Sequence, residues 1–553
     1  MQPECAFELK GPTSSAEHDT GKAIFPIVRS EEESSDEHLD QQDAVLTTTM
    51  TTAQDAHDMQ RMGKTQELIR RFRQISMISF VAIATAAWEI GLFIISPGLI
   101  NGGRSGLIYS SIWNFIGFGP IYLSMSEMAS MGIMQAPIAG AQYHWVSEFA
   151  PEKYQRFLSY VTGWTSTMAW QAGNAMGIFL AGSLVQTIIL INNEYYAFPS
   201  WQGTLLAFAS MLIAYIGSVY GAKVLPYWQT TVFAVHVLGF LAYIVPIWVN
   251  APKASHQQVW ADFQNEGGWS SIGLSLMVGQ LAGISQQVGI DTATHMSEEV
   301  RDAASSVPKT MISVYFINFA LMFLGIVTIC YHIPDLDAAL NDSTTYPAIY
   351  VLKQSLAKGP ITVIMVLIAF VTIASNIVYL TAVTRDLYAF ARDNGLPYSG
   401  WLSRVDSQRR IPVNATIFSS LVACLLALIY IGSPVAFYAI TSLATVSLLQ
   451  CYTLSIACVL WRRICDPDTL PKASFSLGSW GIPINAMAVV YGLWAFFWAF
   501  WPQATPVDAA GFNWASPIFA AVLLMAMVHF VLKAKDQYFG PVTTVEGRDV
   551  GTY

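Results

Sequence analysis

Residues 271–294 form an apolar stretch long enough to cross a membrane, but the stretch carries polar groups that a plain membrane anchor avoids. These interruptions are three glycines, a polar run and a carboxylate: Gly279, Gly283, Gly289, Ser285, Gln286, Gln287 and Asp291. A carboxylate inside a membrane helix costs about 2.5 to 3.5 kcal/mol, and unwound backbone persists at that depth only where it lines protein or water. The pattern therefore predicts a binding site at mid-membrane depth.

Residues 75–100 form a second apolar stretch that is interrupted in a similar way. Glu89 and Gly91 stand in its middle, and the tripeptide Ser96-Pro97-Gly98 closes it. Paired interruptions in two halves of a chain are typical of inverted-repeat transporters, because broken helices expose half-helix ends to a substrate. We therefore expect the two stretches to build one site between two repeats of five helices, with two further helices after them.

The composition places these stretches in a polytopic membrane protein. Of the 553 residues, 54% are apolar and only 12% are charged, about half the charged fraction of soluble domains. Twelve apolar stretches of roughly 20 residues or more are present. They lie at residues 75–100, 106–132, 157–191, 202–221, 227–249, 271–294, 310–330, 360–384, 412–432, 434–461, 482–502 and 513–533. We therefore expect an all-α integral membrane protein with twelve transmembrane helices, of which the first and sixth are broken.

The Lys and Arg residues orient these helices. If the N-terminus lies inside, twenty of them fall in inner segments, and only Arg104, Lys253, Lys353 and Lys358 fall in outer loops. Cytoplasmic loops of membrane proteins hold the excess of positive charge. We therefore expect a protein of the cell membrane with both termini in the cytoplasm, and a vacuolar membrane is the alternative location.

The ends of the chain differ in composition from the transport domain expected at residues 75–534. Residues 1–74 contain the acidic run Glu31-Glu32-Glu33 and many Ser and Thr residues, and they contribute to the net charge of −9. Such a composition predicts a disordered cytoplasmic tail, which is either a solubilising leader or a regulatory segment. Residues 535–553 are expected to form a shorter cytoplasmic tail.

The sequence has no pattern typical of catalysis or metal binding. Its six cysteines have neither metal-ligand nor disulfide spacing, and no nucleophile stands at a workable distance from a base. We therefore expect no enzymatic activity, no cofactor and no metal. The sequon at Asn341 lies in the largest outer loop and predicts glycosylation, whereas the sequon at Asn414 falls at the inner face.

Four groups of motifs carry a family resemblance. They are GIDTATHMSEEV at 289–300, SEMAS with GAQYHWVS at 126–130 and 140–147, TGW with AW at 162–164 and 169–170, and RDLYAFARDNGLP at 385–397. Together they resemble the amino acid, polyamine and organocation permeases, and within that group the fungal amino acid/choline transporter branch. The resemblance covers about residues 65–530.

The resemblance implies a secondary carrier of amino acids or related small amines, built as a five-plus-five inverted repeat with two extra helices and working by alternating access. In this family, backbone groups of the broken helices hold the substrate's carboxylate and amine. The corresponding positions are Glu89, Ile90, Gly91, Ser285, Gln286, Gln287, Val288 and Gly289. The expected partners are this substrate, a proton as the coupling ion and the lipid bilayer, with no nucleic acid.

Two other functions stay open on the residues themselves. Glu89 could neutralise a substrate ammonium, or it could be satisfied by backbone amides. Trp88 could form an aromatic box with Trp164 and Trp170 around choline or another cationic amine, or these rings could simply pack. Choline is therefore the alternative substrate, and a nutrient sensor that binds without transport is a further alternative.

Two titratable residues suit proton coupling. His236 stands in the middle of the fifth apolar stretch, and histidine changes charge near neutral pH. Glu89 could take the coupling proton as well, because burial favours the neutral form of a carboxyl group. A hydrogen bond within the bundle is the alternative role for His236.

The remaining candidates lie toward the inner end of the sixth stretch. Asp291 follows the break, and we expect it to cap the second half-helix, with direct substrate contact as the alternative. Glu298, Glu299 and Arg385 stand at the inner ends of the sixth and eighth stretches, where they form either an intracellular gate or ordinary interfacial charges.

Overall fold

The computed structural model describes residues 67–131, 139–432, 436–509 and 511–541. Within these ranges the regular structure is helical, and the one extended pairing is an isolated bridge between Phe72 and Val300. The predicted all-helical architecture is confirmed. Most of the two predicted tails lies outside the described residues.

Ten helical segments of the described ranges are long and apolar enough to cross a membrane. They are α3 (Gln74–Thr85) with α4 (Ala87–Gly91), α8 (Glu152–Asn192), α9 (Ser200–Tyr220), α10 (Leu225–Asn250), α14 (Ala303–Tyr331), α17 (Lys358–Arg392), α19 (Val413–Ala427) with α20 (Ile429–Gly432), α21 (Ala436–Cys465), α22 (Gly481–Trp498) and α23 (Ala515–Leu532). Each overlaps a predicted span. The other two predicted spans contain α6 (Gly103–Met131), which is long but more polar, and α12 (Ile272–Ser285), which has 14 residues. The total of twelve spans stays a prediction.

Short helices fill the connections between the long ones. They are α5 (Ser96–Ile100), α7 (Ala141–Phe149), α11 (His256–Trp260), α13 (Thr292–His295), α15 (Leu336–Leu340), α16 (Pro347–Ser355), α18 (Ser399–Leu402) and 3-10 turns at Ser297–Glu299, Pro467–Thr469, Gly478–Trp480 and Ala534–Asp536.

The first membrane segment is broken three residues before the predicted carboxylate. α3 ends at Thr85, and Ala86 adopts a left-handed backbone with a φ of 38° before α4 begins. This conformation costs an L-residue about 1 to 2 kcal/mol, so the residue type at position 86 gave no sign of the break. The carbonyl of Ala84, in the last turn of α3, accepts a hydrogen bond of 3.0 Å from Ser375 Oγ of α17. Tertiary contacts with α17 therefore help to hold this break.

The sixth membrane segment is broken where the glycine and polar residues predicted. α12 ends at Ser285, and helical structure resumes only with α13 at Thr292. Gly289 has a φ of 97°, a conformation that residues with a Cβ rarely adopt, and its N–H donates to Tyr452 Oη of α21 at 3.3 Å. The unwound backbone is thus held by a side chain of a neighbouring helix.

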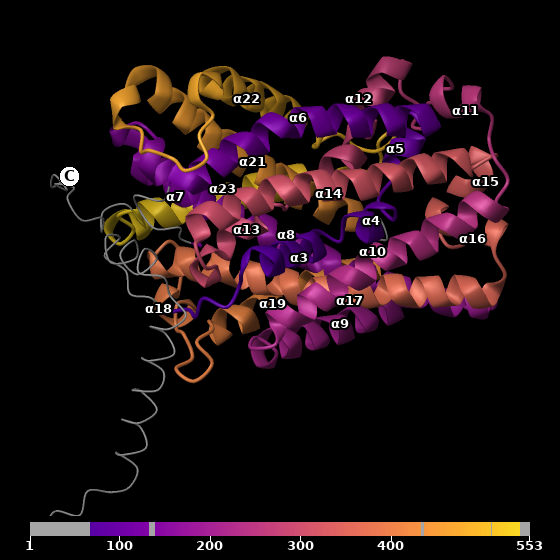
Figure 1. The fold of residues 1–553 in the computed structure, drawn as a ribbon, viewed down its shortest axis with the longest axis horizontal. Helices are drawn as coiled ribbons and strands as arrows, with labels where there is room; N and C mark the ends of the chain where they lie inside the picture. The colour runs from indigo at the N-terminus through magenta and orange to yellow at the C-terminus, as the bar shows by residue number, and fades with distance from the viewer. Residues whose placement is uncertain (1–66, 132–138, 433–435, 510, 542–553) are drawn as a thin grey trace, which may run out of the picture. The chain divides into compact units, whose positions relative to one another are not determined.

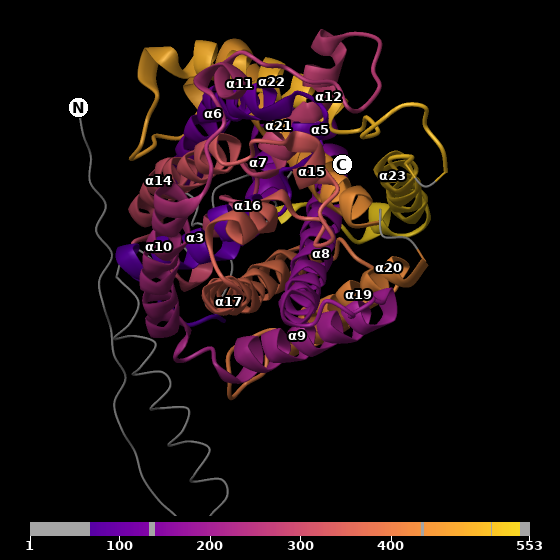
Figure 2. The same ribbon diagram turned by 90° about the vertical axis from the view of Figure 1, so that its right-hand side faces the viewer.

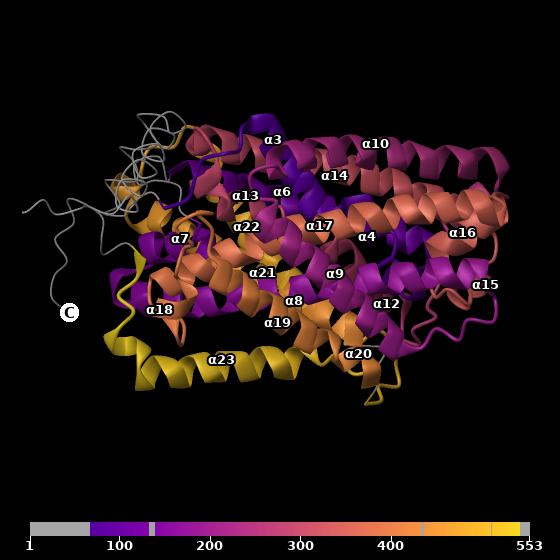
Figure 3. The ribbon, with the colours of Figure 1, turned by 90° about the horizontal axis from the view of Figure 1, so that it is seen from below.

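The long helix α8 lies in the interior of the described bundle, where it contacts α7, α9, α17, α19, α21 and α23. Figure 1 shows that α10, α14 and α17 run in roughly the same direction, and Figure 2 views α17 nearly end-on. In Figure 3, α23 lies along one edge of these helices. Gly173 and Gly177 of α8 allow close approach of α17, because a Cβ at Gly173 would lie 2.0 Å from Tyr379 Oη. Two small residues four apart are typical of close helix contacts in membranes.

Candidate substrate site

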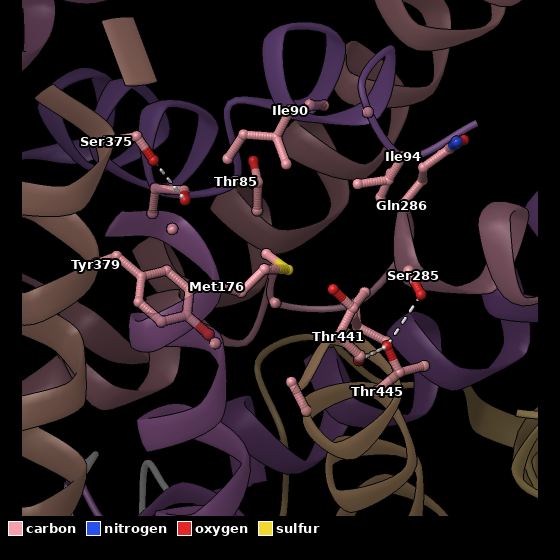
Figure 4. A pocket seen from close by; sticks show the side chains of 18 of the residues that line it. Thr85, Ile90, Ile94, Met176, Ser285, Gln286, Ser375, Tyr379, Thr441 and Thr445 are labelled. Carbon is pink, nitrogen blue, oxygen red and sulfur yellow. Dashed lines mark hydrogen bonds between the residues drawn. The ribbon is translucent and has the colours of Figure 1, made fainter. Parts of the chain in front are cut away.

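The two breaks meet at a cavity of about 70 Å³ (Figure 4). Its walls come from both broken segments and from α8, α17 and α21. The lining residues are Ala84, Thr85, Ala87, Ile90, Gly91, Ile94, Gly173, Met176, Gly177, Ser285, Gln286, Val288, Gly289, Ser375, Asn376, Tyr379, Thr441, Ala444, Thr445 and Leu448. None of these side chains carries a formal charge. Hydroxyl and amide groups are the polar contacts that they offer to a ligand.

The predicted substrate contacts divide into two sets. Six of them line the cavity, namely Ile90, Gly91, Ser285, Gln286, Val288 and Gly289. The other four, Trp88, Glu89, Gln287 and Asp291, are buried but are not among the lining residues. The carboxylates of Glu89 and Asp291 therefore make their contacts outside the cavity wall.

The walls formed by α8, α17 and α21 were missed from the sequence. Thr441, Thr445 and Leu448 follow one another at intervals of about one helical turn and present one face of α21 to the cavity. Ser285 Oγ lies 3.0 Å from Thr445 Oγ1, which donates to the Thr441 carbonyl at 2.8 Å (Figure 4). The helical spacing of these hydroxyl residues within an apolar stretch was the available signal.

Glu89 and His236 form a buried pair between α4 and α10. His236 Nδ1 lies 2.7 Å from Glu89 Oε1 and 2.9 Å from Oε2, and both side chains are fully buried. Trp88 donates its indole N–H to the His236 carbonyl at 3.2 Å. Both proton-coupling candidates therefore meet, and the pair stands directly beside the cavity residues Ile90 and Gly91.

Asp291 does not cap the second half-helix, so that prediction is wrong. It occupies the position before α13, but its side chain makes no capping hydrogen bond. Its carboxylate instead accepts hydrogen bonds from Gln142 Nε2 at 2.7 Å and from Tyr452 Oη. These donors from distant segments satisfy the charge in place of the helix N–H groups.

The three tryptophans do not form an aromatic box. The Trp88 ring contacts Phe240 and Tyr243, the Trp170 ring contacts His295 and Tyr379, and the Trp164 ring contacts Tyr160 and His529. None of the three lines the cavity. The prediction of a shared box is therefore wrong, because the three rings pack at separate places.

The three predicted gate residues lie in one network, but not all contact each other. Arg385 Nε donates to Glu299 Oε1 at 2.7 Å, and Glu298 pairs with Arg392 at 2.8 Å. The Phe72–Val300 bridge joins the segment before α3 to the same region, with the Phe72 N–H donating to the Glu299 carbonyl at 3.0 Å. The network therefore ties both broken segments to α17.

The predicted glycosylation site is exposed. Asn341 directly follows α15, and its side-chain amide donates to the Asp337 carbonyl at 2.9 Å. Its accessibility permits modification, which stays a prediction.

An apolar helical body with two broken segments and an uncharged internal cavity is typical of a multi-pass membrane transport protein. The family model described as "Amino acid permease" matches residues 75–528. The chain therefore belongs to the amino acid permease family, as its motifs predicted. The family indicates a permease rather than an enzyme.

Several relatives are similar over most of this chain. A Macrophomina phaseolina protein named for amino acid/polyamine transport is 27% identical, covering 80% of this chain and 97% of the relative. The choline transporter of Saccharomyces cerevisiae is 25% identical, and the match covers 80% of this chain and 77% of that relative. The GABA-specific permease of the same yeast is 25% identical, and the match covers 88% of this chain and 86% of that relative. These names span zwitterionic and cationic substrates, so similarity alone leaves the substrate open.

Proposed function

We propose that the chain is a proton-coupled secondary transporter that carries small zwitterionic amino acids or related amines by alternating access. The observation that carries the proposal is the cavity where the two broken segments meet. Broken helices around a central site are the arrangement that transporters with inverted repeats use to bind their substrates.

The cavity wall favours a zwitterion over an ion with net charge. α3 and α12 both end on the wall, at Thr85 and Ser285. The carbonyl end of a helix carries roughly half a negative charge, so two such ends favour the ammonium group of an amine. Hydroxyl and amide donors then remain for a carboxylate. A strongly cationic or anionic side chain would find no opposite formal charge among the lining residues.

Choline is the weaker alternative. The relative named as a choline transporter supports it. A quaternary ammonium is usually held by aromatic rings or by a carboxylate. Among the described residues that line the cavity, Tyr379 is the only aromatic one, and the Glu89 carboxylate is bonded to His236 instead.

The Glu89–His236 pair is the proposed site of the coupling proton. The pair is neutral when it holds one proton, and it leaves a buried negative charge when that proton departs. Because an uncompensated buried charge is strongly unfavourable, loss of the proton favours a conformation in which water or another group reaches the pair. α4 carries both Glu89 and three cavity residues, so its movement would link the proton to the substrate.

The proposed topology has twelve spans and cytoplasmic termini in the cell membrane. In that orientation, the Arg385–Glu299 and Arg392–Glu298 pairs lie at the cytoplasmic side of the cavity. These two ion pairs and the Phe72–Val300 bridge form one network, which we call the inner network. We assign it to the inner gate, and the gate is closed in this conformation.

The test is a competition panel in proteoliposomes that contain the full chain. Labelled alanine, 4-aminobutyrate, choline and spermidine are offered with and without an inward proton gradient. We expect the gradient to drive accumulation of the zwitterions, and excess choline to compete weakly. Preferential choline uptake would support the alternative substrate, and binding of a ligand without any accumulation would support a sensor.

A further inference from the structure

A second buried titratable cluster lies apart from the Glu89–His236 pair. The His295 ring stands between two carboxylates: its Nε2 lies 3.6 Å from Asp291 Oδ2, and its Nδ1 lies 3.7 Å from Asp386 Oδ1. All three side chains are almost completely buried. None of them is among the described residues that line the cavity.

The hydrogen bonds of the ring fix which nitrogen is free to take a proton. His295 Nδ1 lies 2.9 Å from the carbonyl oxygen of Ala139. A carbonyl can only accept, so Nδ1 carries the hydrogen in the neutral ring, and Nε2 carries the lone pair. Nε2 is buried and has no hydrogen-bond partner in the described part of the chain. In the neutral ring, this lone pair would face the Asp291 carboxylate without a proton between them.

Protonation of Nε2 would change this contact from unfavourable to favourable. The ring would become an imidazolium between two carboxylates, which favours the charged form. Both carboxylates already have other donors: Asp386 accepts from Ser166 Oγ at 2.7 Å and from Thr167 Oγ1 at 3.2 Å, while Asp291 accepts from Gln142. The carboxylates are therefore held in place around the ring.

In the described part of the chain, four further titratable groups that interact with Asp291 carry no positive charge. They are Tyr379 of α17, Cys451 and Tyr452 of α21 and Tyr122 of α6, each interacting with Asp291. The basic residue next in sequence to Asp386, Arg385, is bonded to Glu299. α3 carries no charged residue, and Trp170 of α8 places its ring edge-on to His295 at 4.9 Å.

We propose that His295, held between Asp291 and Asp386, is a second proton-binding site of this protein. The bound proton stabilises the contact of the sixth segment with the segment 139–142, because His295 binds Ala139 and Asp291 binds Gln142. Its loss would weaken this contact at the inner gate. The site does not depend on the Glu89–His236 pair, and it stands whether or not that pair carries a coupling proton.

The test measures proton binding directly. Infrared difference spectra of the full chain in lipid nanodiscs are recorded between about pH 5 and 8, the range in which histidine titrates. We expect imidazole and carboxylate bands that disappear in His295→Gln. His332→Gln is the matched control, since His332 is also buried, and its Nδ1 also bonds a backbone carbonyl, that of Thr328 at 2.7 Å. His332 faces Lys253 instead of a carboxylate, so the bands should persist in this control.

A second variant covers the case in which His295→Gln fails to fold. Asp386→Asn keeps the shape of the side chain and removes one negative charge beside the ring. We expect the midpoint of the His295 bands to move to lower pH by about one unit, a tenfold weaker proton affinity. Bands that are unchanged in His295→Gln, or a midpoint that is unchanged in Asp386→Asn, would overturn the proposal. Because no substrate or gradient is used, the result is readable even if transport fails.

Discussion

At the scale of single residues, the two predicted carboxylates have different partners from those that sequence alone suggests. Glu89 is bonded to His236 of α10, and Asp291 is bonded to Tyr452 of α21. In the proposed repeats, each broken helix therefore directs its carboxylate to the last helix of its own half. The partner from that last helix is an imidazole for Glu89 and a phenol for Asp291, and the imidazole near Asp291, that of His295, belongs to the broken sixth segment itself.

We predict that Glu89→Gln and His236→Gln each abolish accumulation driven by a proton gradient but retain exchange of internal for external substrate. Exchange needs the cavity, which neither residue lines, whereas accumulation needs the coupling proton. Counterflow and gradient-driven uptake of labelled alanine in the same proteoliposomes measure the two activities. Undiminished accumulation in both variants would exclude the pair as the coupling site.

We predict that Gly173→Ala destabilises the protein by about 1 to 3 kcal/mol, the usual cost of overpacking. The new Cβ would lie 2.0 Å from Tyr379 Oη. Removal of that hydroxyl in Gly173→Ala/Tyr379→Phe should restore part of the lost thermal stability. Gly359→Ala is the control, because its added Cβ meets no atom within 4 Å. Equal melting temperatures for the Gly173 and Gly359 variants would contradict this packing.

At the scale of helices and their breaks, the sequence predicted the break in the sixth membrane segment better than the break in the first. The sixth break was predictable, because Gly289 and the polar run are unfavourable in a membrane helix. The first break was predicted only in part: α4 ends at the predicted Gly91, but the left-handed Ala86 was missed, because alanine is a good helix former. The partners of Asp291 were not predictable, since Gln142 and Tyr452 stand 149 and 161 positions away. The cavity faces of α8, α17 and α21 depend on how these helices pack.

The inner network gives a prediction at this scale. Arg385→Ala leaves Glu299 buried without its ion-pair partner, at a cost of about 3 to 5 kcal/mol in the closed conformation. We therefore expect a shift toward an inward-open state, measured as faster labelling of Ser297→Cys by a thiol reagent from the cytoplasmic side. The inverted pair Arg385→Glu/Glu299→Arg should reverse part of the effect.

Lys358→Ala is the control for the inner network. Lys358 forms an ion pair of 2.6 Å with Glu194, but both side chains are mostly exposed to solvent in the described structure. Exposed ion pairs contribute little to stability. Its removal should leave Ser297→Cys labelling unchanged, and labelling that rises equally in both variants would argue against a specific role for Arg385.

At the scale of the whole molecule, the class of membrane protein and the permease family were predictable from the sequence. Both depend on apolar stretches and motifs that are distributed over the whole chain. In the described ranges, ten apolar helical segments of membrane length overlap the predicted spans, and the family match extends over residues 75–528. The predicted orientation rests on the distribution of Lys and Arg, and it would place Asn341 outside and Asn414 inside. The two sequons therefore test the orientation, because only a sequon on the outer side can be glycosylated.

We predict that expression in a eukaryotic host yields a glycosylated protein whose mobility on a gel increases after glycosidase treatment. Asn341→Gln should abolish this shift, and Asn414→Gln should leave it unchanged. A shift that depends on Asn414 would invert the topology and place the Arg385–Glu299 network on the outer side.

The central claim is that movement of substrate and movement of a proton are coupled. It is tested most directly by adding alanine to proteoliposomes that have no preset gradient while a dye reports the external pH. The account predicts that alanine entry makes the external medium more alkaline, because each cycle carries a proton inward, and that choline produces a much smaller change. Alanine uptake at the same rate with no change in external pH would contradict proton coupling.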